Sequence, residues 1–128
     1  MKKRDKMIYF AHAICTYGSE EEEELIEQIK NFFPDLEIVN PGSIDNIPET
    51  MLDGMEFYKR VVNKCDILIF SRLNGKVTSG VGIEINHALL KKKTVYEIKK
   101  KKLFIIKKPI KYLSRDDTIR LYDKWRGL

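Results

Sequence analysis

Short apolar runs alternate with amphipathic stretches along this chain. Continuous apolar runs are typical of strands that are covered on both faces of a sheet. Apolar residues that recur every three or four positions are typical of helices that pack on one side. The pattern predicts strands at residues 7–11, 36–39, 67–70, 94–98 and 103–106. It also predicts helices that follow Ser19, Pro48, Ser79 and Ser114, the second of them reaching Asn63.

Strands and helices alternate along most of the chain, which predicts an α/β fold. Right-handed crossovers between apolar strands favour an open three-layer sandwich around a mainly parallel five-stranded sheet. The turn between Ile98 and Leu103 is too short for a crossover, which favours an antiparallel last strand. If the strand order is 2-1-3-4-5, ligands are expected where the loops 12–18 and 71–79 meet, beyond the carboxyl ends of the strands.

The 128 residues suit one domain that spans residues 1–128. No apolar stretch approaches the ~18 residues of a membrane-spanning helix, so a cytoplasmic protein without a membrane partner is expected. The net charge of +5 is uneven: residues 1–64 hold 8 Lys/Arg and 13 Asp/Glu, whereas residues 65–128 hold 16 and 6. The lysine runs lack interleaved arginines and aromatics, so a nucleic-acid partner is not expected. Cys15 and Cys65 lack metal-site spacing, and neither a metal nor a cofactor is expected.

The most informative stretch is the turn 78–82, which reads Thr-Ser-Gly-Val-Gly and precedes the third helix. Ser79 is a candidate cap for this helix. Each glycine near a helix start costs about 1 kcal/mol relative to alanine, so the pair needs an explanation. One explanation is an anion site, because the free N–H groups at a helix start attract phosphate. The other is close packing of the helix against the sheet, and the pattern leaves both open.

Glu84 follows this turn and is the first candidate for chemistry. Near a helix start its carboxylate is expected to stay ionised, and an ionised carboxylate can act as a nucleophile or stabilise a positive transition state. Tyr9, near the end of the first strand, and Asp53 or Glu56 on the second helix are titratable groups from which a general acid could come. Each also has a structural explanation, with Tyr9 as a core aromatic and the two acids as solvated groups.

Three segments carry a resemblance to a known family: Ile8-Tyr9-Phe10 with the loop of small residues after it, Cys65-Asp66-Ile67-Leu68-Ile69, and Gly80-Val81-Gly82-Ile83-Glu84-Ile85. They are similar to the nucleoside 2-deoxyribosyltransferase superfamily, and most to its 2'-deoxynucleoside 5'-phosphate N-hydrolase branch, whose motif reads Gly-Val-Gly-Tyr-Glu-Leu. The resemblance spans roughly residues 7–98. It implies a flavodoxin-like (Rossmann-like) fold, cleavage of an N-glycosidic bond, no metal or cofactor, and homodimers or larger homo-oligomers that complete each other's sites.

The resemblance also implies roles for single residues. Glu84 matches the nucleophile that attacks the anomeric carbon, and Tyr9 matches a tyrosine that lines the sugar side. Thr78 stands where the transferases carry an Asp that binds the sugar 5'-hydroxyl and the phosphate-reading hydrolases a Ser. Tyr58 stands where the hydrolases carry their second-helix Asp, so Glu56 or Asp53 is left as the general acid. Substrate-binding residues are expected in the first loop and at the helix start: His12, Ala13, Ile14, Thr78, Ser79, Gly80 and Gly82.

These observations predict an enzyme that cleaves or transfers the N-glycosidic bond of a (deoxy)nucleoside 5'-monophosphate or a nucleoside. A hydroxyl at Thr78 beside helix N–H groups suits a phosphate, which favours a nucleotide as the substrate. The first loop, however, contains no arginine to hold a phosphate. Two alternatives remain. One is a non-catalytic nucleotide-binding or sensor module on the same fold, and the other is a TIR-like NAD glycohydrolase, which also uses a glutamate.

Overall fold

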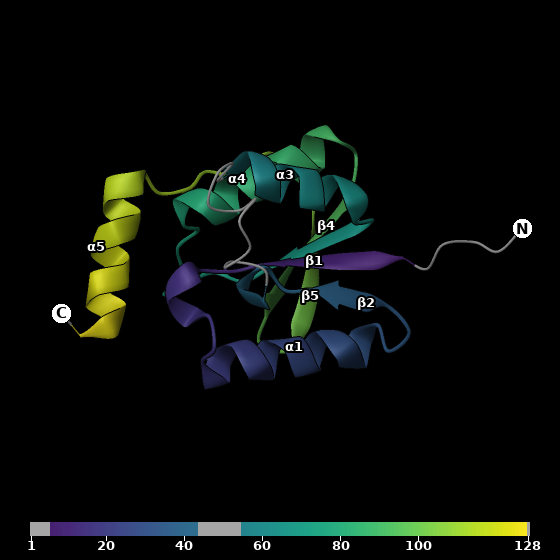
Figure 1. Cartoon of the computed structure of the whole chain (residues 1–128), viewed down its shortest axis with the longest axis horizontal. Coiled ribbons are helices and arrows are strands. Elements are labelled where there is room, and N and C mark those ends of the chain that lie inside the picture. Colours follow the sequence, from purple (N-terminus) through teal and green to yellow (C-terminus); the bar gives the residue numbers. More distant parts are fainter. Residues whose placement is uncertain (1–5, 44–54, 128) are drawn as a thin grey trace, which may run out of the picture.

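A five-stranded sheet lies at the centre of the molecule (Figure 1). The structure is a computed structural model and describes residues 6–43 and 55–127. The strands lie in the predicted order 2-1-3-4-5, which is confirmed. Their bounds are β1 (Met7–Ala11), β2 (Glu37–Val39), β3 (Ile67–Phe70), β4 (Thr94–Lys99) and β5 (Lys102–Ile106).

The sheet is mixed, which corrects the expectation of a mainly parallel sheet. Strand β1 pairs in parallel with β2 and β3, and β3 pairs in parallel with β4, but β5 runs antiparallel to β4. Lys100 and Lys101 connect the last two strands and have positive φ angles of 51° and 61°. Two such residues make a tight hairpin turn and leave no room for a crossover helix. The antiparallel last strand therefore follows from the short turn, as the sequence indicated.

Helices cover both faces of the sheet and produce three layers (Figure 1). Helix α1 (Glu20–Phe32) covers one face, and helices α3 (Met55–Lys64) and α4 (Ser79–Leu90) cover the other. Side chains alternate along a strand, so Ile8 and Phe10 pack in the cluster under α1, whereas Tyr9 packs in the cluster under α4. Among the described helices, none combines the length and the apolar character needed to cross a bilayer.

The helix starts were predicted with mixed success. Ser19 caps α1 by accepting the Glu22 N–H at 3.2 Å, and Ser114 caps α5 (Arg115–Arg126) by accepting the Asp117 N–H at 3.1 Å. Both caps are confirmed. The predicted start of the second helix at Pro48 lies outside the described residues, and α3 extends to Lys64.

Helix α4 is capped by another helix instead of by its own turn. It begins at Ser79, so Thr78 occupies the N-cap position, and the Thr78 side chain makes no capping hydrogen bond. The Thr118 hydroxyl on α5 accepts the Ser79 N–H at 2.9 Å. The candidate Ser79 is therefore not the cap, because a residue 39 positions later supplies the oxygen.

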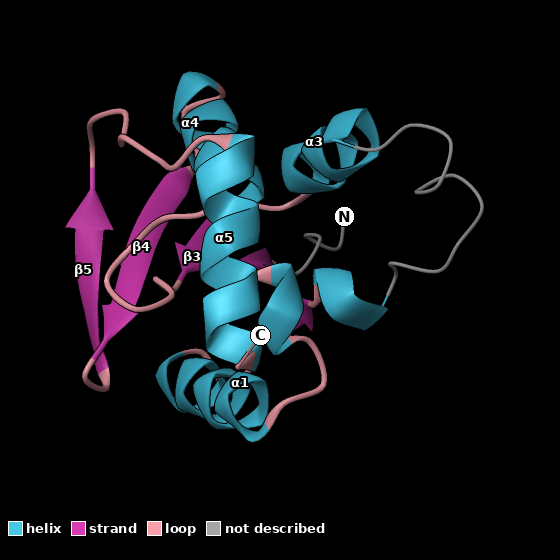
Figure 2. Ribbon diagram, turned by 90° about the vertical axis from the view of Figure 1, so that its left-hand side faces the viewer, coloured by secondary structure: helices cyan, strands magenta, loops and turns pink. Residues whose placement is uncertain are grey.

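Helix α5 crosses the carboxyl edge of the sheet between α4 and α1 (Figure 2). The segment 109–113, here called the strap, leads to it and is fixed to α4. The Asn86 side chain accepts the Ile110 N–H at 2.9 Å and donates to the Ile110 carbonyl at 3.1 Å. The Leu113 N–H donates to the Val77 carbonyl at 2.9 Å. These bonds hold the first turn of α5 against the start of α4.

Gly82 provides the space in which the strap reaches α4. A methyl group added at Gly82 would lie 2.2 Å from Cγ and 2.3 Å from Cβ of Tyr112. A contact at Cβ cannot be relieved by rotating the ring alone, so the strap itself would have to shift. Close packing is therefore the explanation for this glycine, although against the strap and not, as expected, against the sheet.

Gly82→Ala is expected to lower the free energy of unfolding by about 1–3 kcal/mol, because the added methyl group overpacks the contact with Tyr112. Gly80→Ala is the matched control, since among the described residues its methyl group meets only Met55 Sδ, at 3.8 Å, and alanine favours a helix. Urea denaturation of both variants measures the difference. Equal stability of the two variants would contradict the packing explanation.

Candidate active site

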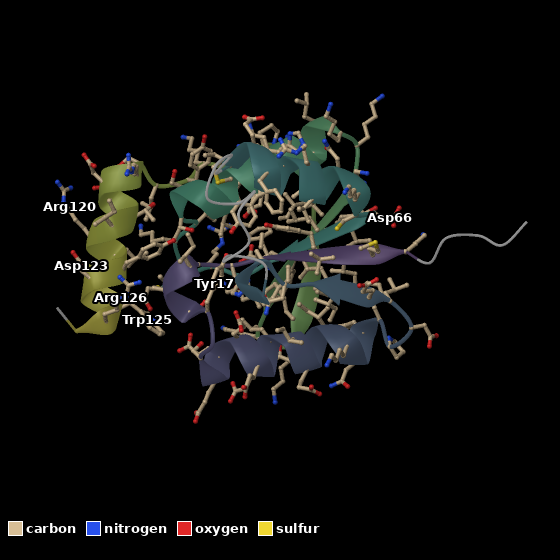
Figure 3. All side chains as sticks on the ribbon, viewed as in Figure 1. Tyr17, Asp66, Arg120, Asp123, Trp125 and Arg126 are labelled. Carbon is tan, nitrogen blue, oxygen red and sulfur yellow. The ribbon has the colours of Figure 1, made fainter. Side chains whose placement is uncertain are left out.

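A small cavity lies at the carboxyl edge of the sheet, between the end of β1 and the start of α4. Its volume is about 30 Å³, and roughly 10–15 Å³ is enough for one water molecule. Figure 3 shows Tyr17 at this end of the molecule, near α5, and Asp66 at the opposite end. The lining residues are His12, Ile14, Tyr17, Met55, Tyr58, Thr78, Gly80, Val81, Glu84 and Tyr122.

Glu84 and Tyr9 form the centre of this site. Glu84 comes from the second turn of α4 and is only 6% exposed, and Tyr9 comes from β1 and is fully buried. The Tyr9 hydroxyl donates a short hydrogen bond to Oε2 of Glu84. Burial and the neighbouring carboxylate raise the pKa of the Tyr9 phenol far above its ordinary value, so it stays a donor. The two residues thus hold one carboxyl group in a fixed orientation beside the cavity.

The charge of Glu84 differs from the expectation. Burial raises the pKa of the Glu84 carboxyl from its ordinary value of 4.5 to about 8, and the hydrogen bond from Tyr9 opposes this rise only in part. The expected stabilisation of the anion by the helix start is outweighed by the loss of water. In the closed cavity at neutral pH the carboxyl is therefore mostly protonated.

Thr78 presents an unpartnered hydroxyl to the cavity. It is 2% exposed, and its Oγ1 has no hydrogen-bond partner within residues 6–43 and 55–127. The Tyr122 hydroxyl lies close to the Thr78 hydroxyl and to the Ile14 backbone. These contacts lower the pKa of Tyr122, but burial raises it by more. The approach to Thr78 lacks the geometry of a full hydrogen bond. A buried oxygen in this state can accept a ligand hydroxyl or a water.

His12 is held by a buried pair that the sequence did not predict. Its Nδ1 donates to the Phe10 carbonyl at 3.0 Å, and its Nε2 lies 2.6 Å from Oε2 of Glu22 on α1. The His12 ring also stacks on Phe10 with 4.0 Å between ring centres. Both ring nitrogens are thus engaged, and the other Glu22 oxygen accepts the Gly18 N–H at 3.2 Å. The pair fixes the loop that forms one wall of the cavity.

The structure brings together some of the expected site residues and separates others. His12, Ile14, Thr78, Gly80 and Glu84 line the cavity, and Tyr9 bonds to Glu84. The other expected residues do not line it: Ala13, Ser79, Gly82 and Glu56.

Glu56 does not face the cavity. Its side chain is 70% exposed and lies 3.3 Å from the Lys59 ammonium, one turn further along α3. The alternative general acid, Asp53, lies outside the described residues.

The expected anion site at the start of α4 is partly occupied by the protein itself. Thr118 takes the Ser79 N–H at 2.9 Å, and the Gly82 N–H donates to the Thr78 carbonyl at 2.9 Å. Two of the N–H groups expected to bind phosphate are therefore engaged. This part of the expectation is corrected, because α5 and the helix itself supply the acceptors.

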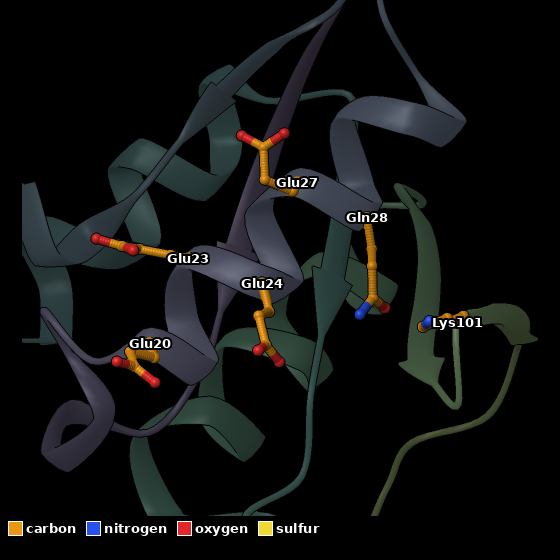
Figure 4. A pocket seen from close by; sticks show the side chains of 6 residues that line it. All are labelled: Glu20, Glu23, Glu24, Glu27, Gln28 and Lys101. Carbon is orange, nitrogen blue, oxygen red and sulfur yellow. The ribbon is translucent and has the colours of Figure 1, made fainter.

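A larger hollow lies elsewhere and contains none of the expected residues. It measures about 590 Å³ and is lined by Glu20, Glu23, Glu24, Glu27, Gln28 and Lys101 (Figure 4). The carboxylates of Glu23 and Glu27 point apart, as expected for the solvated start of α1. In the described part of the chain, no group of three or more His, Cys, Asp or Glu side chains is arranged to hold a metal ion.

Sequence reasoning missed the residues that reach the site from α5 and α1. Thr118 and Tyr122 lie four residues apart on one face of α5, but nothing in the sequence places that helix against α4. Glu22 belongs to an acidic run whose other members are exposed, so its burial has no sequence signal. Only long-range contacts identify these three residues.

Comparison with known proteins leaves the functional interpretation to the geometry. No protein-family model matches the chain, and no curated protein is significantly similar to it. The resemblance described above therefore stays a prediction.

Proposed function

We propose that this protein cleaves or transfers the N-glycosidic bond of a nucleoside or a (deoxy)nucleoside 5'-monophosphate, with Glu84 as the nucleophile. The observation that carries the proposal is the hydrogen bond from Tyr9 to Glu84 beside a cavity at the carboxyl edge of the sheet. Ligands of open α/β sheets bind at this edge, where the strand order reverses between β1 and β3. A carboxyl group buried and oriented there is a suitable candidate for chemistry.

The proposed reaction has two steps. In the first, an oxygen of ionised Glu84 attacks C1' of the sugar, the C1'–N bond breaks, and the electron pair leaves with the base nitrogen, which takes up a proton. In the second, a water or another base attacks C1' and releases the Glu84 carboxylate. Tyr9 holds the carboxylate oriented through both steps. Opening the cavity to a substrate readmits polar contacts to Glu84, which favours its ionised, reactive form.

The remaining assignments rest on the resemblance. We propose a flavodoxin-like fold. The strand order and the three parallel pairings are compatible with it. A cytoplasmic location and a homodimer or larger homo-oligomer are part of the same proposal. Glu56 stays the proposed general acid on α3, although its carboxylate is exposed and paired with Lys59.

A second candidate is a non-catalytic binding or sensor module, and two observations favour it. The cavity of about 30 Å³ is far smaller than a nucleoside. The Glu84 carboxyl, with a pKa of about 8, is mostly neutral at pH 7 and is then a poor nucleophile. The two candidates differ in one property, which is release of the base.

Base release from a panel of nucleosides, their 5'-monophosphates and NAD tests the proposal. Chromatography at pH 8.5, where half or more of Glu84 is ionised, is expected to detect a free base from at least one nucleoside or nucleotide. Glu56→Gln is assayed beside wild type. If Glu56 is the general acid, its loss lowers the rate of base release by about 10²–10⁴-fold. Release from NAD alone would favour the glycohydrolase alternative, and ligand binding without any release would favour the binding module.

A further inference from the structure

We propose that the first turn of α5 makes the site selective for ligands without a phosphate group. Thr118 holds the first N–H group of α4, one of those that a phosphate would need, so that nucleosides bind in preference to nucleoside 5'-monophosphates. The inference rests on the proposed function where it concerns cleavage of a substrate. The expected difference in binding between nucleoside and monophosphate does not depend on turnover. It assigns a specificity role to α5, a helix outside the segment that carries the resemblance.

The backbone at the start of α4 is the first observation. A helix binds phosphate through the N–H groups of its first turn, which have no partner within the helix. Here the Ser79 N–H, the first of these groups, already donates to Thr118 Oγ1 at 2.9 Å. Thr118 is 6% exposed, so this bond is shielded from water and the Ser79 N–H is not available to a ligand oxygen while it persists.

The charge around the cavity is the second observation. A phosphate monoester carries about −1.5 to −2 charges at pH 7, and burying such a charge without a cation is costly. No lysine or arginine is among the described residues that line the cavity. His12, the one basic lining residue described, has both ring nitrogens engaged by Phe10 and Glu22.

The position of Thr118 is fixed, which is the third observation. Thr118 lies in the first turn of α5, which follows the strap, and the strap is bonded to α4 by Asn86 and to Val77 by the Leu113 N–H. Tyr112 of the strap fills the space beside Gly82. The capping bond is therefore part of the packed structure. Tyr122, one turn further along α5, lines the cavity and is half-buried.

A neutral ligand suits the remaining polar group. Thr78 Oγ1 is buried, faces the cavity, and has no partner within the described ranges. A sugar hydroxyl can donate to this oxygen and accept from its proton, with no charge to bury. The unpartnered hydroxyl and the occupied N–H together favour an uncharged group at this end of the site.

The test compares matched pairs of a nucleoside and its 5'-monophosphate, with inorganic phosphate as a third probe. For wild type, kcat/KM is expected to be at least about tenfold higher for the nucleoside, and the nucleoside is expected to raise Tm more than the monophosphate. Thr118→Ala frees the Ser79 N–H and opens space, so the ratio is expected to fall by about tenfold. Thr118→Ser keeps the hydroxyl and is expected to keep the wild-type ratio.

The outcomes separate the inference from the proposed function. A wild type that cleaves the monophosphate as well as the nucleoside, or better, overturns the selectivity and leaves the proposed function intact. If no base is released, the proposed function fails, and the Tm shifts alone test the selectivity. A larger Tm shift with the monophosphate or inorganic phosphate than with the nucleoside overturns the inference. An unchanged ratio in Thr118→Ala overturns the role of Thr118. Should that variant not fold, Thr118→Val, which keeps the shape and removes the acceptor, replaces it.

Discussion

Glu84→Gln is expected to lower base release by on the order of 10³-fold or more while ligand binding persists. Glutamine keeps the size of the side chain and can still accept the hydrogen bond from Tyr9, but it removes the charge that attacks C1' and stabilises the oxocarbenium-like transition state. Single-turnover measurement of base release at pH 8.5 gives the chemical rate, and a Tm shift with the same ligand reports binding.

Two further variants show whether this loss is specific. Tyr9→Phe removes the donor to Glu84 and is expected to lower the rate by about 10–100-fold, because the carboxylate loses its orientation. Glu27→Gln makes the same chemical change on α1, where the side chain is 71% exposed and far from the cavity lining, and leaves the rate unchanged. Equal turnover by wild type and Glu84→Gln would show that Glu84 is not the nucleophile.

The stability of the protein is expected to fall as the pH rises from about 4.5 to about 8, through the titration of Glu84. The pKa of this carboxyl is about 8 in the folded protein and near 4.5 when unfolded. Between these values the folded state keeps a proton that the unfolded state releases, so a rise in pH favours unfolding. The penalty is absent well below pH 4.5 and complete above pH 8, and it amounts to about 5 kcal/mol.

Glu84→Gln isolates this effect from every other titrating group. The variant is expected to lie within about 1 kcal/mol of wild type at pH 5 and to exceed its free energy of unfolding at pH 9 by about 5 kcal/mol. Urea denaturation of both proteins at pH 5, 7 and 9 measures the difference. A difference that stays constant across these pH values would mean that Glu84 titrates alike in the folded and unfolded states.

The fold followed from local patterns in the chain. The apolar run at 67–70 became a strand buried at every position, and Ser19 and Ser114 became helix caps. Each of these features depends on residues near one another in sequence. The antiparallel last strand likewise follows from a turn of two lysines.

The site was predicted only where its chemistry is local to one motif. Glu84 and Thr78 line the cavity as expected, because the strand, loop and helix that hold them are consecutive in sequence. The charge of Glu84 was not predictable, since its pKa depends on burial by the whole site and not on distance from the helix start. Thr118 was missed for a similar reason, as its contact with Ser79 spans 39 residues.

The most direct measurement of the central claim is capture of the sugar on the enzyme. Wild-type protein is mixed with a cleaved substrate labelled in its sugar, quenched in acid within one turnover, and digested for peptide mass spectrometry. The account predicts a sugar ester on the peptide that contains Glu84, and no ester in Glu84→Gln. Base release by wild type with the label on another residue, or with no labelled peptide within the first turnover, would contradict it.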